Sequence, residues 1–418
     1  MNHNNSLKDF YLVALGQIIS LFGNQILRYA LPLYLLAATG SSSLFGSINA
    51  VSFLPMVLLF PIGGIIADRM NKRNIMVILD YITAGLITIF CLLTGHWNMV
   101  VLIGVTMILL YGIQGVYQPT VKASIPVLVG DDQIMKANSV VDVINSLSSM
   151  TGPVLGGILY TVLGLRFILI VSIVCFFLSA TMELFIHIPY QKREATGNIF
   201  QIAKTDISQA IHYMNKSEPT LMKMSLFYAF INLLLSTLIM IGVPVIVTQH
   251  LDFNPDVASR LYGYSQGIIS AASIIGGVLA GILSKKLKPK NIPMIITVCS
   301  SIMLIIGVTI LTTDNSYIIY GMLVGGCACV LALQTLFTVM ILSMIQMLCP
   351  SELTGKIIAC VMCIAMCTNP IGQFLYGMLF DIFTESLYLP YFLAGSIMMV
   401  ICFICRKVFV DSETKSVL

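Results

Sequence analysis

The chain has 418 residues, of which 58% are hydrophobic and only 10% are charged. A water-soluble protein of this length needs a polar exterior, and so few polar residues cannot supply one. The formal net charge of +4 is small and dispersed along the chain, so the composition gives no indication of a nucleic-acid partner.

Long apolar stretches recur from one end of the sequence to the other. An apolar helix of about 20 residues crosses a bilayer, and lipid offers no hydrogen-bond partner to an open sheet edge. We therefore predict an all-α membrane protein with twelve transmembrane helices. The predicted spans are residues 10–38, 44–67, 74–94, 97–118, 137–160, 164–187, 219–248, 260–283, 292–312, 316–347, 355–380 and 388–407.

The lysines and arginines indicate how the chain crosses the membrane. Most lie in alternate loops and in the two tails, which the twelve spans place on one side. The exceptions are Arg28, Arg166 and Arg260. Because cytoplasmic loops are enriched in Lys and Arg, we expect both termini to lie in the cytoplasm.

Arg28 is a charged residue well inside the first predicted span. Asn24 lies one helical turn before it and Gln25 three residues before it, so the three share a face. Ionisable residues at membrane depth are functional candidates by default. We interpret this face, with Tyr29, as part of a substrate cavity in which Arg28 meets a substrate anion or a buried carboxylate. The alternative is an arginine that extends to the outer headgroups or binds carbonyls of the seventh span.

A short charged segment, residues 63–73, separates the second and third spans. We expect Asp68 to meet the start of the eleventh span, near Ser351, Thr354 and Gly355. There a carboxylate finds unpaired backbone N–H groups and the positive end of the helix dipole. Such a contact would hold the cytoplasmic side closed in one conformation and break in the other. The gating candidates of this segment are Gly64, Asp68, Arg69, Lys72 and Arg73.

The same cations have a plainer interpretation, in which they only follow the enrichment of positive charge in cytoplasmic loops. In the gating interpretation, Arg69 and Arg73 join neighbouring helix ends, with Asp142 as their acidic partner. At the other end of the eleventh span, Asp381 and Glu385 follow the last apolar residues. We expect both of these acids to be solvated.

Three carboxylates lie within predicted spans: Asp80 in the third, Asp142 in the fifth and Glu183 in the sixth. A proton-driven transporter needs a carboxyl group that binds and releases protons near neutral pH. Asp142 is our first candidate for the proton carrier, and Asp80 and Glu183 are the others. Ion pairs between the loop cations and Asp80 or Asp142 are the alternative.

Polar and aromatic side chains on other spans complete the predicted cavity. Flat aromatic rings with amide groups suit a large amphipathic guest that is held mostly by apolar contact. A packed helix interface would explain the same residues, and both interpretations remain open. These substrate-binding candidates are Tyr111, Gln114, Tyr117, Asn232, Ser236 and Gln334.

Small residues on the fifth span indicate a helix surface that moves. Gly152, Gly156 and Gly157 allow close packing against a neighbour, and Pro153 removes a backbone donor and bends the helix. We therefore add these four residues to the gating candidates. The eleven cysteines are interpreted as small apolar residues, so no metal site is predicted.

The second half of the sequence repeats the first. The Gly-Gly pair at Gly63 in the second span recurs at Gly276 in the eighth, 213 residues later (276 minus 63). We therefore expect two pseudo-symmetric bundles of six helices, residues 1–188 and 219–418, joined by a cytoplasmic linker over 189–218. Two such halves around a midplane cavity are the plan of many secondary transporters.

The charged segment resembles the loop signature G-x-x-x-D-R-x-G-R-R of the major facilitator superfamily, with Asn71 where glycine is usual. Because Asn tolerates left-handed backbone, the turn could survive. The run 148–157 resembles the antiporter signature G-x-x-x-G-P-x-x-G-G, with Ser148 in place of the first glycine. Gln17 and Ser20 in span one, Pro119–Pro126, and Pro370–Gln373 look like the macrolide-efflux-like branch.

The resemblance implies a multi-pass protein of the bacterial cytoplasmic membrane, acting on a small-molecule substrate. It implies export of macrolide-like drugs by proton antiport, and hence a role in antibiotic or multidrug resistance. A siderophore or other anionic metabolite exporter, favoured by Arg28, and a lysophospholipid flippase are the alternatives. We predict a monomer without a cofactor. No phosphate-binding G-x-x-x-x-G-K-[ST] motif occurs and no two histidines share a helix face, so an enzyme is not predicted.

Overall fold

The computed structural model describes residues 3–129, 134–188, 208–283, 291–348 and 351–416. Within these ranges the regular structure is helical, and every one of the twelve predicted spans contains helix. Nine of the described helices are long and apolar enough to cross a membrane. The prediction of an all-α membrane protein is confirmed.

The first part of the chain forms five helices. They are α1 (His3–Thr39), α2 (Ser42–Arg69), α3 (Lys72–Leu93), α4 (Met99–Leu128) and α5 (Ile134–Glu183). The last of these combines two predicted spans, and it is broken at Gly164, whose φ of 75° glycine adopts readily. The break separates the fifth span from the sixth.

The second part continues with the helices α7 (Pro219–Ile231), α8 (Thr237–Val245), α9 (Pro255–Leu283), α10 (Ile292–Thr312), α11 (Ser316–Leu348), α12 (Ser351–Ile382) and α13 (Tyr388–Ser416). Three π-helical turns accompany them, namely η2 (Tyr213–Ser217), η3 (Asn232–Ser236) and η4 (Ile246–His250). The predicted seventh span is therefore one helical path in which η3 and η4 widen the turns on either side of α8. Such turns often occur at functional sites.

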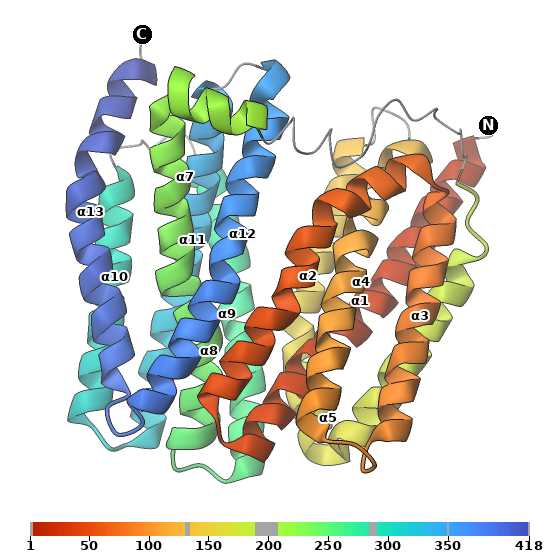
Figure 1. Cartoon of the computed structure of the whole chain (residues 1–418), viewed down its shortest axis with the longest axis horizontal. Coiled ribbons are helices and arrows are strands. Elements are labelled where there is room, and N and C mark those ends of the chain that lie inside the picture. The colour runs from red at the N-terminus through yellow and green to blue at the C-terminus, as the bar shows by residue number, and fades with distance from the viewer. Residues whose placement is uncertain (1–2, 130–133, 189–207, 284–290, 349–350, 417–418) are drawn as a thin grey trace. The chain divides into compact units, whose positions relative to one another are not determined.

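The described chain forms two compact units. Unit 1 comprises residues 1–39, 51–199 and 259–267, and unit 2 comprises residues 40–50, 200–258 and 268–418. In unit 1, α1 and α3 pack mainly against α5, while in unit 2 the most extensive packing joins α10 to α13, which lie side by side in Figure 1. Two helices are divided between the units. Helix α2 contributes residues 42–50 to unit 2 and its remainder to unit 1, and α9 contributes residues 259–267 to unit 1 and its two ends to unit 2. The predicted domain limits, 1–188 and 219–418, stay predictions.

Candidate functional site

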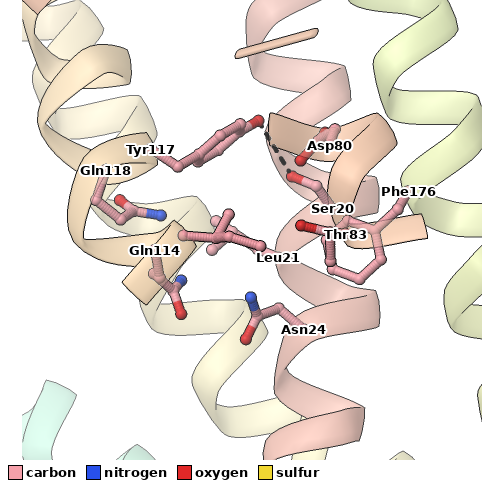
Figure 2. Close-up of a pocket in the computed structure, with 10 residues that line it drawn as sticks. Ser20, Leu21, Asn24, Asp80, Thr83, Gln114, Tyr117, Gln118 and Phe176 are labelled. Carbon is pink, nitrogen blue, oxygen red and sulfur yellow. Dashed lines mark hydrogen bonds between the residues drawn. The ribbon is translucent and has the colours of Figure 1, made fainter. Parts of the chain in front are cut away.

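A cluster of polar side chains is buried in unit 1 around the hydroxyl group of Tyr117. This hydroxyl donates a hydrogen bond to Glu183 Oε1 at 2.7 Å and accepts one from Gln17 Nε2 at 2.8 Å. Ser20 Oγ lies 3.5 Å from the same oxygen, as the dashed line in Figure 2 shows. We call Gln17, Ser20, Asp80, Tyr117, Ser179 and Glu183 the Tyr117 cluster.

Two carboxyl groups share this cluster. Asp80 is 3% exposed and Glu183 is fully buried, and the hydroxyl groups of Ser179 and Tyr117 are neighbours of Asp80. Asp80 Oδ2 and Glu183 Oε2 have no hydrogen-bond partner among the described residues. Among the described residues, the polar neighbours of the two carboxyl groups are hydroxyls. No described cation forms an ion pair with either carboxyl group.

Four helices bring the cluster together. Gln17 and Ser20 lie three residues apart on α1 and so share a face, Asp80 lies on α3, Tyr117 on α4 and Glu183 at the end of α5. Helices α1 and α5 approach closely where Ser179 Oγ donates to the carbonyl of Gly16 at 3.1 Å.

A small cavity of about 20 Å³ lies beside Asp80 (Figure 2). A space of this size holds one water molecule, provided that polar groups line it. Two of the residues that line the cavity, Asp80 and Gln118, each have a buried polar atom, Oδ2 and Nε2, without a hydrogen-bond partner among the described residues. The lining residues are Ser20, Leu21, Asn24, Asp80, Thr83, Ile113, Gln114, Tyr117, Gln118 and Phe176.

Arg28 lies against α4. Its guanidinium carbon is 4.2 Å from the centre of the Tyr111 ring, and Nη1 donates to Gln114 Oε1 at 3.3 Å. A cation over an aromatic face is electrostatically attracted to it. Three of the predicted substrate-binding residues are therefore in contact, and Gln114 also lines the cavity beside Asp80. The role of Arg28 in substrate binding and its alternative, contact with headgroups or with carbonyls of the seventh span, both stay predictions.

Tyr29 is used in packing. It is buried, its ring stacks on that of Tyr262 at 4.8 Å, and its hydroxyl donates to the carbonyl of Ser259 at 2.6 Å. The glycines of the fifth span explain this close approach. A Cβ atom on Gly156 would lie 3.1 Å from Tyr29 Cδ1, and one on Gly152 would lie 2.5 Å from Gln25 Cβ. Tyr29 and Gln25 thus face the glycine surface of α5.

Unit 2 contains a second, neutral polar cluster. Gln334 on α11 donates to Ser236 Oγ at 2.5 Å and to Asn232 Oδ1 at 3.4 Å, and Ser236 donates to Asn232 at 3.3 Å. Asn232 and Ser236 are the two ends of η3. The structure therefore brings together the three polar residues that the sequence indicated on spans seven and ten, and we call them the Gln334 cluster.

The predicted gating segment is described only in part. The side chains of Asp68, Arg69 and Asp142 lie outside the described residues, as do those of the expected partners at the start of α12. Arg73 donates to the carbonyl of Leu184. Asn71 has a φ of −65° and accepts a hydrogen bond from the Arg73 amide at 3.1 Å. The expected left-handed backbone at Asn71 is wrong, because this residue caps the start of α3 through its side chain.

The remaining gating candidates are described mainly through their backbone. Pro153 lies inside α5, and Lys72 is the first residue of α3. A Cβ atom on Gly64 would meet nothing within 4 Å, whereas one on Gly157 would lie 3.1 Å from the carbonyl oxygen of Ser259. Close helix packing therefore requires a glycine at 157 and not at 64.

Sequence reasoning also missed two features. The sequence analysis assigned no function to Ser179, because a single serine in an apolar span gives no signal that distinguishes it from other small residues. It expected Asp381 to be solvated and did not anticipate the protein partners of this half-buried carboxylate. The carboxylate of Asp381 accepts hydrogen bonds from Ser41 Oγ and from the backbone amides of Ser42 and Ser43.

Comparison with known proteins places these observations in a family. Residues 13–363 match the model of the Major Facilitator Superfamily. Macrolide efflux protein A of Streptococcus pyogenes is 23% identical over 283 residues, which are 67% of this chain and 68% of that protein.

Solved structures agree on the fold. A bacterial homologue of the iron transporter ferroportin aligns with a TM-score of 0.72 at 14% identity, over 97% of this chain and 99% of that one. A bacterial homologue of the lysosomal transporter Spinster aligns with a TM-score of 0.70 at 13% identity, over 99% of both chains. The resemblance read from the sequence motifs is confirmed, and the chain belongs to the Major Facilitator Superfamily.

Proposed function

We propose that this membrane transporter exports amphipathic small molecules of the macrolide type by alternating access, in exchange for protons. The observation that carries the proposal is the pair of buried carboxyl groups, Asp80 and Glu183, that meet at the hydroxyl of Tyr117. Buried ionisable groups in membrane spans mark ion and proton pathways. The similarity to macrolide efflux protein A supports the direction and the substrate class.

Counting hydrogen bonds indicates that the pair carries a proton. Tyr117 has one hydroxyl proton, which it donates to Glu183, and its lone pair accepts from Gln17. If Asp80 were also ionised, two buried carboxylates would compete for this proton, with no cation beside them among the described residues. Like charges so close cannot both ionise without a large cost. A protonated Asp80 instead becomes a donor, and the competition disappears.

This assignment changes the order of the proton-carrier candidates. Asp142 came first in the sequence, and its side chain lies outside the described residues. Asp80 and Glu183 have the burial and the shared hydroxyl that a proton carrier requires, so we propose them as the carrier. Loss of the proton would leave two charges in an apolar bundle. The relief of that repulsion, by entry of water or movement of a helix, would couple proton release to the conformational change.

Substrate and proton would communicate through Gln114. This residue accepts the hydrogen bond of Arg28 and lines the cavity next to Asp80. A guest that stacks on Tyr111 would displace Arg28 and free the amide of Gln114. The resulting change in the wall of the cavity would alter the hydration of Asp80.

The proposal is tested by uptake of radiolabelled erythromycin into everted membrane vesicles. A pH gradient, acid inside, should drive accumulation, and collapse of the gradient with nigericin should abolish it. Asp80→Asn and Glu183→Gln should each reduce gradient-driven accumulation by about 5- to 150-fold, the range of typical coupling free energies. Asp314→Asn neutralises an exposed acid and should have no effect.

Two results would contradict the proposal. Accumulation that survives nigericin would exclude proton antiport, and full activity of both carboxyl variants would remove the pair from the mechanism. Exchange of labelled for unlabelled erythromycin, measured without a gradient, distinguishes loss of coupling from loss of folding. Both variants should retain this exchange.

One observation favours an anionic substrate as a second candidate. Arg28 carries a positive charge that, among the described residues, is met by a ring and an amide, and a guest with a carboxylate or hydroxamate would pair with it. Arg28→Gln keeps the polar contact and removes the charge. Loss of export of an anionic siderophore with unchanged macrolide export would support this candidate, and the opposite pattern would exclude it.

A further inference from the structure

Asp381 lies next to the last residue of α12 and contacts the first turn of α2. Its Oδ1 accepts from the Ser42 amide at 2.7 Å, and its Oδ2 accepts from the Ser43 amide and from Ser41 Oγ, both at 2.9 Å. The first amides of a helix have no partner within the helix. A carboxylate that binds them is stabilised both by these charge-assisted bonds and by the helix dipole.

The two helices meet backbone to backbone at this place. A Cβ atom on Gly46 would lie 2.4 Å from the carbonyl oxygen of Gln373, and one on Gly377 would lie 2.7 Å from the carbonyl oxygen of Ser42. Any larger residue at either glycine would push the helices apart. The contact therefore includes close backbone approach, the bonds of one carboxylate, and a hydrogen bond from Ser43 Oγ to the Gly377 carbonyl at 3.4 Å.

Helix α2 is shared between the two units. Its start, within residues 40–50, belongs to unit 2, and its remainder, from residue 51, belongs to unit 1. The bonds to Asp381 are thus part of what attaches the start of α2 to unit 2. Helix α9, which contains the eighth span, is also divided, because its residues 259–267 belong to unit 1 and its two ends belong to unit 2. There a Cβ atom on Gly263 would lie 2.9 Å from the carbonyl oxygen of Pro153.

We infer that Asp381 is a positioning residue of the transport cycle, which holds the first turn of α2 against α12 in one conformation and releases it in the other. The inference rests on alternating access and on no particular substrate or coupling ion. In the orientation expected from the cationic loops, this contact lies at the outer ends of the helices. At the inner ends, the sequence suggested that Asp68, at the end of the second span, binds the first amides of the eleventh. Here Asp381, near the end of α12, binds the first amides of α2.

The test is hydrogen–deuterium exchange of the full-length protein in lipid nanodiscs, read by mass spectrometry. Asp381→Ala should accelerate exchange in residues 40–50 at least about fivefold, the lower end of the range for coupled conformational equilibria. If Asp381 stabilises one conformation of the transporter and not only the first turn of α2, its loss shifts the conformational equilibrium of the protein. Exchange in residues 259–267 should then rise as well, while residues 292–312 in the packed α10 keep their rate.

Three further variants sharpen the result. Gly377→Ala separates the helices while Asp381 remains, and it should reproduce the pattern of Asp381→Ala. Asp381→Glu keeps the charge and should restore slow exchange at least in part. Glu385→Gln removes an exposed acid near the same helix end and should change nothing.

Two results would overturn the inference. Unchanged exchange in residues 40–50 of Asp381→Ala would show that the carboxylate does not hold α2. Faster exchange in residues 40–50 alone would show that it caps a helix without affecting the conformational equilibrium. Because neither readout uses substrate or a pH gradient, both remain informative if the proposed macrolide–proton antiport is wrong.

Discussion

The Tyr117 cluster in unit 1 and the Gln334 cluster in unit 2 are built alike but differ in charge. Each joins polar side chains from different helices inside an apolar bundle through a buried glutamine, Gln17 in one and Gln334 in the other. The first contains two carboxyl groups and a phenol, and the second contains amides and a hydroxyl. Of these two clusters, the first alone contains carboxyl groups, on which the proposed proton coupling rests. The polar chemistry of the two clusters therefore differs, although both lie among apolar helices.

The two clusters also differ in the energetic cost of their buried polar atoms that lack a described hydrogen-bond partner. In the Gln334 cluster, Gln334 Oε1 is a neutral acceptor without a described partner, which costs about 1–3 kcal/mol. In the Tyr117 cluster, the oxygens without a described partner belong to carboxyl groups, and their cost depends on protonation. A neutral cluster therefore has one stable arrangement at all pH values, whereas the carboxyl cluster changes its preference when a proton leaves.

The largest effect is expected when a charge is introduced into the neutral cluster. Gln334→Glu would bury a carboxylate without a described cation, and we expect a loss of about 3–5 kcal/mol in stability at neutral pH. The loss should shrink as the pH falls, because the protonated side chain resembles glutamine. Thermal unfolding of detergent-solubilised protein over a pH series measures this.

Gln334→Met is the matched control, because it keeps the side-chain volume and should show no such pH dependence. Equal unfolding temperatures of the Glu variant at acid and neutral pH would mean that unit 2 tolerates charge as unit 1 does. The comparison between the two clusters would then fail.

A smaller effect is expected from Tyr117→Phe. The change removes the hydroxyl that joins Glu183 to Gln17 and leaves two buried groups without their partner, at a cost of about 1–3 kcal/mol. It also removes the donor for which the two carboxyls compete. The pH dependence of erythromycin accumulation in vesicles should therefore shift, while exchange transport is retained.

Tyr81→Phe is the control, because it removes a phenol hydroxyl from unit 1 that contacts Thr181 outside the Tyr117 cluster. An unaltered pH profile in Tyr117→Phe would indicate that this hydroxyl fills space without bridging the two acids.

The smallest effect is expected outside both clusters, at the start of α3. Asn71→Ala removes the side-chain oxygen that accepts from the Arg73 amide, and loss of such a cap costs about 1 kcal/mol. Transport should fall only as far as stability does. Asn71→Asp keeps the acceptor and should retain stability, whereas a large transport defect in Asn71→Ala with normal stability would assign this loop a direct role in gating.

The sequence by itself determined the helical membrane fold and the family, because these follow from apolar length and from local motifs. The repeat of two six-helix halves, inferred from spacing along the chain, stays a prediction. The sequence also indicated that Tyr111 lies with Gln114, and Asn232 with Ser236, because residues three or four apart share a helix face. The contact of Arg28 with the first pair depends on packing between α1 and α4. The sequence could not determine that Asn71 caps α3, since an N-cap and a left-handed turn favour the same residue.

Only the tertiary structure decided which faces of different helices meet. Periodicity shows the direction in which a side chain points from its own helix, but it contains no information on the rotation of one helix against another. Tyr117 and Glu183 are 66 residues apart in the chain, and Asp381 and Ser42 are 339 apart. Their hydrogen bonds depend on packing between helices, and for Asp381 also on the glycines that allow two backbones to touch. The Tyr117 cluster and the α2–α12 contact therefore became visible only in the folded molecule.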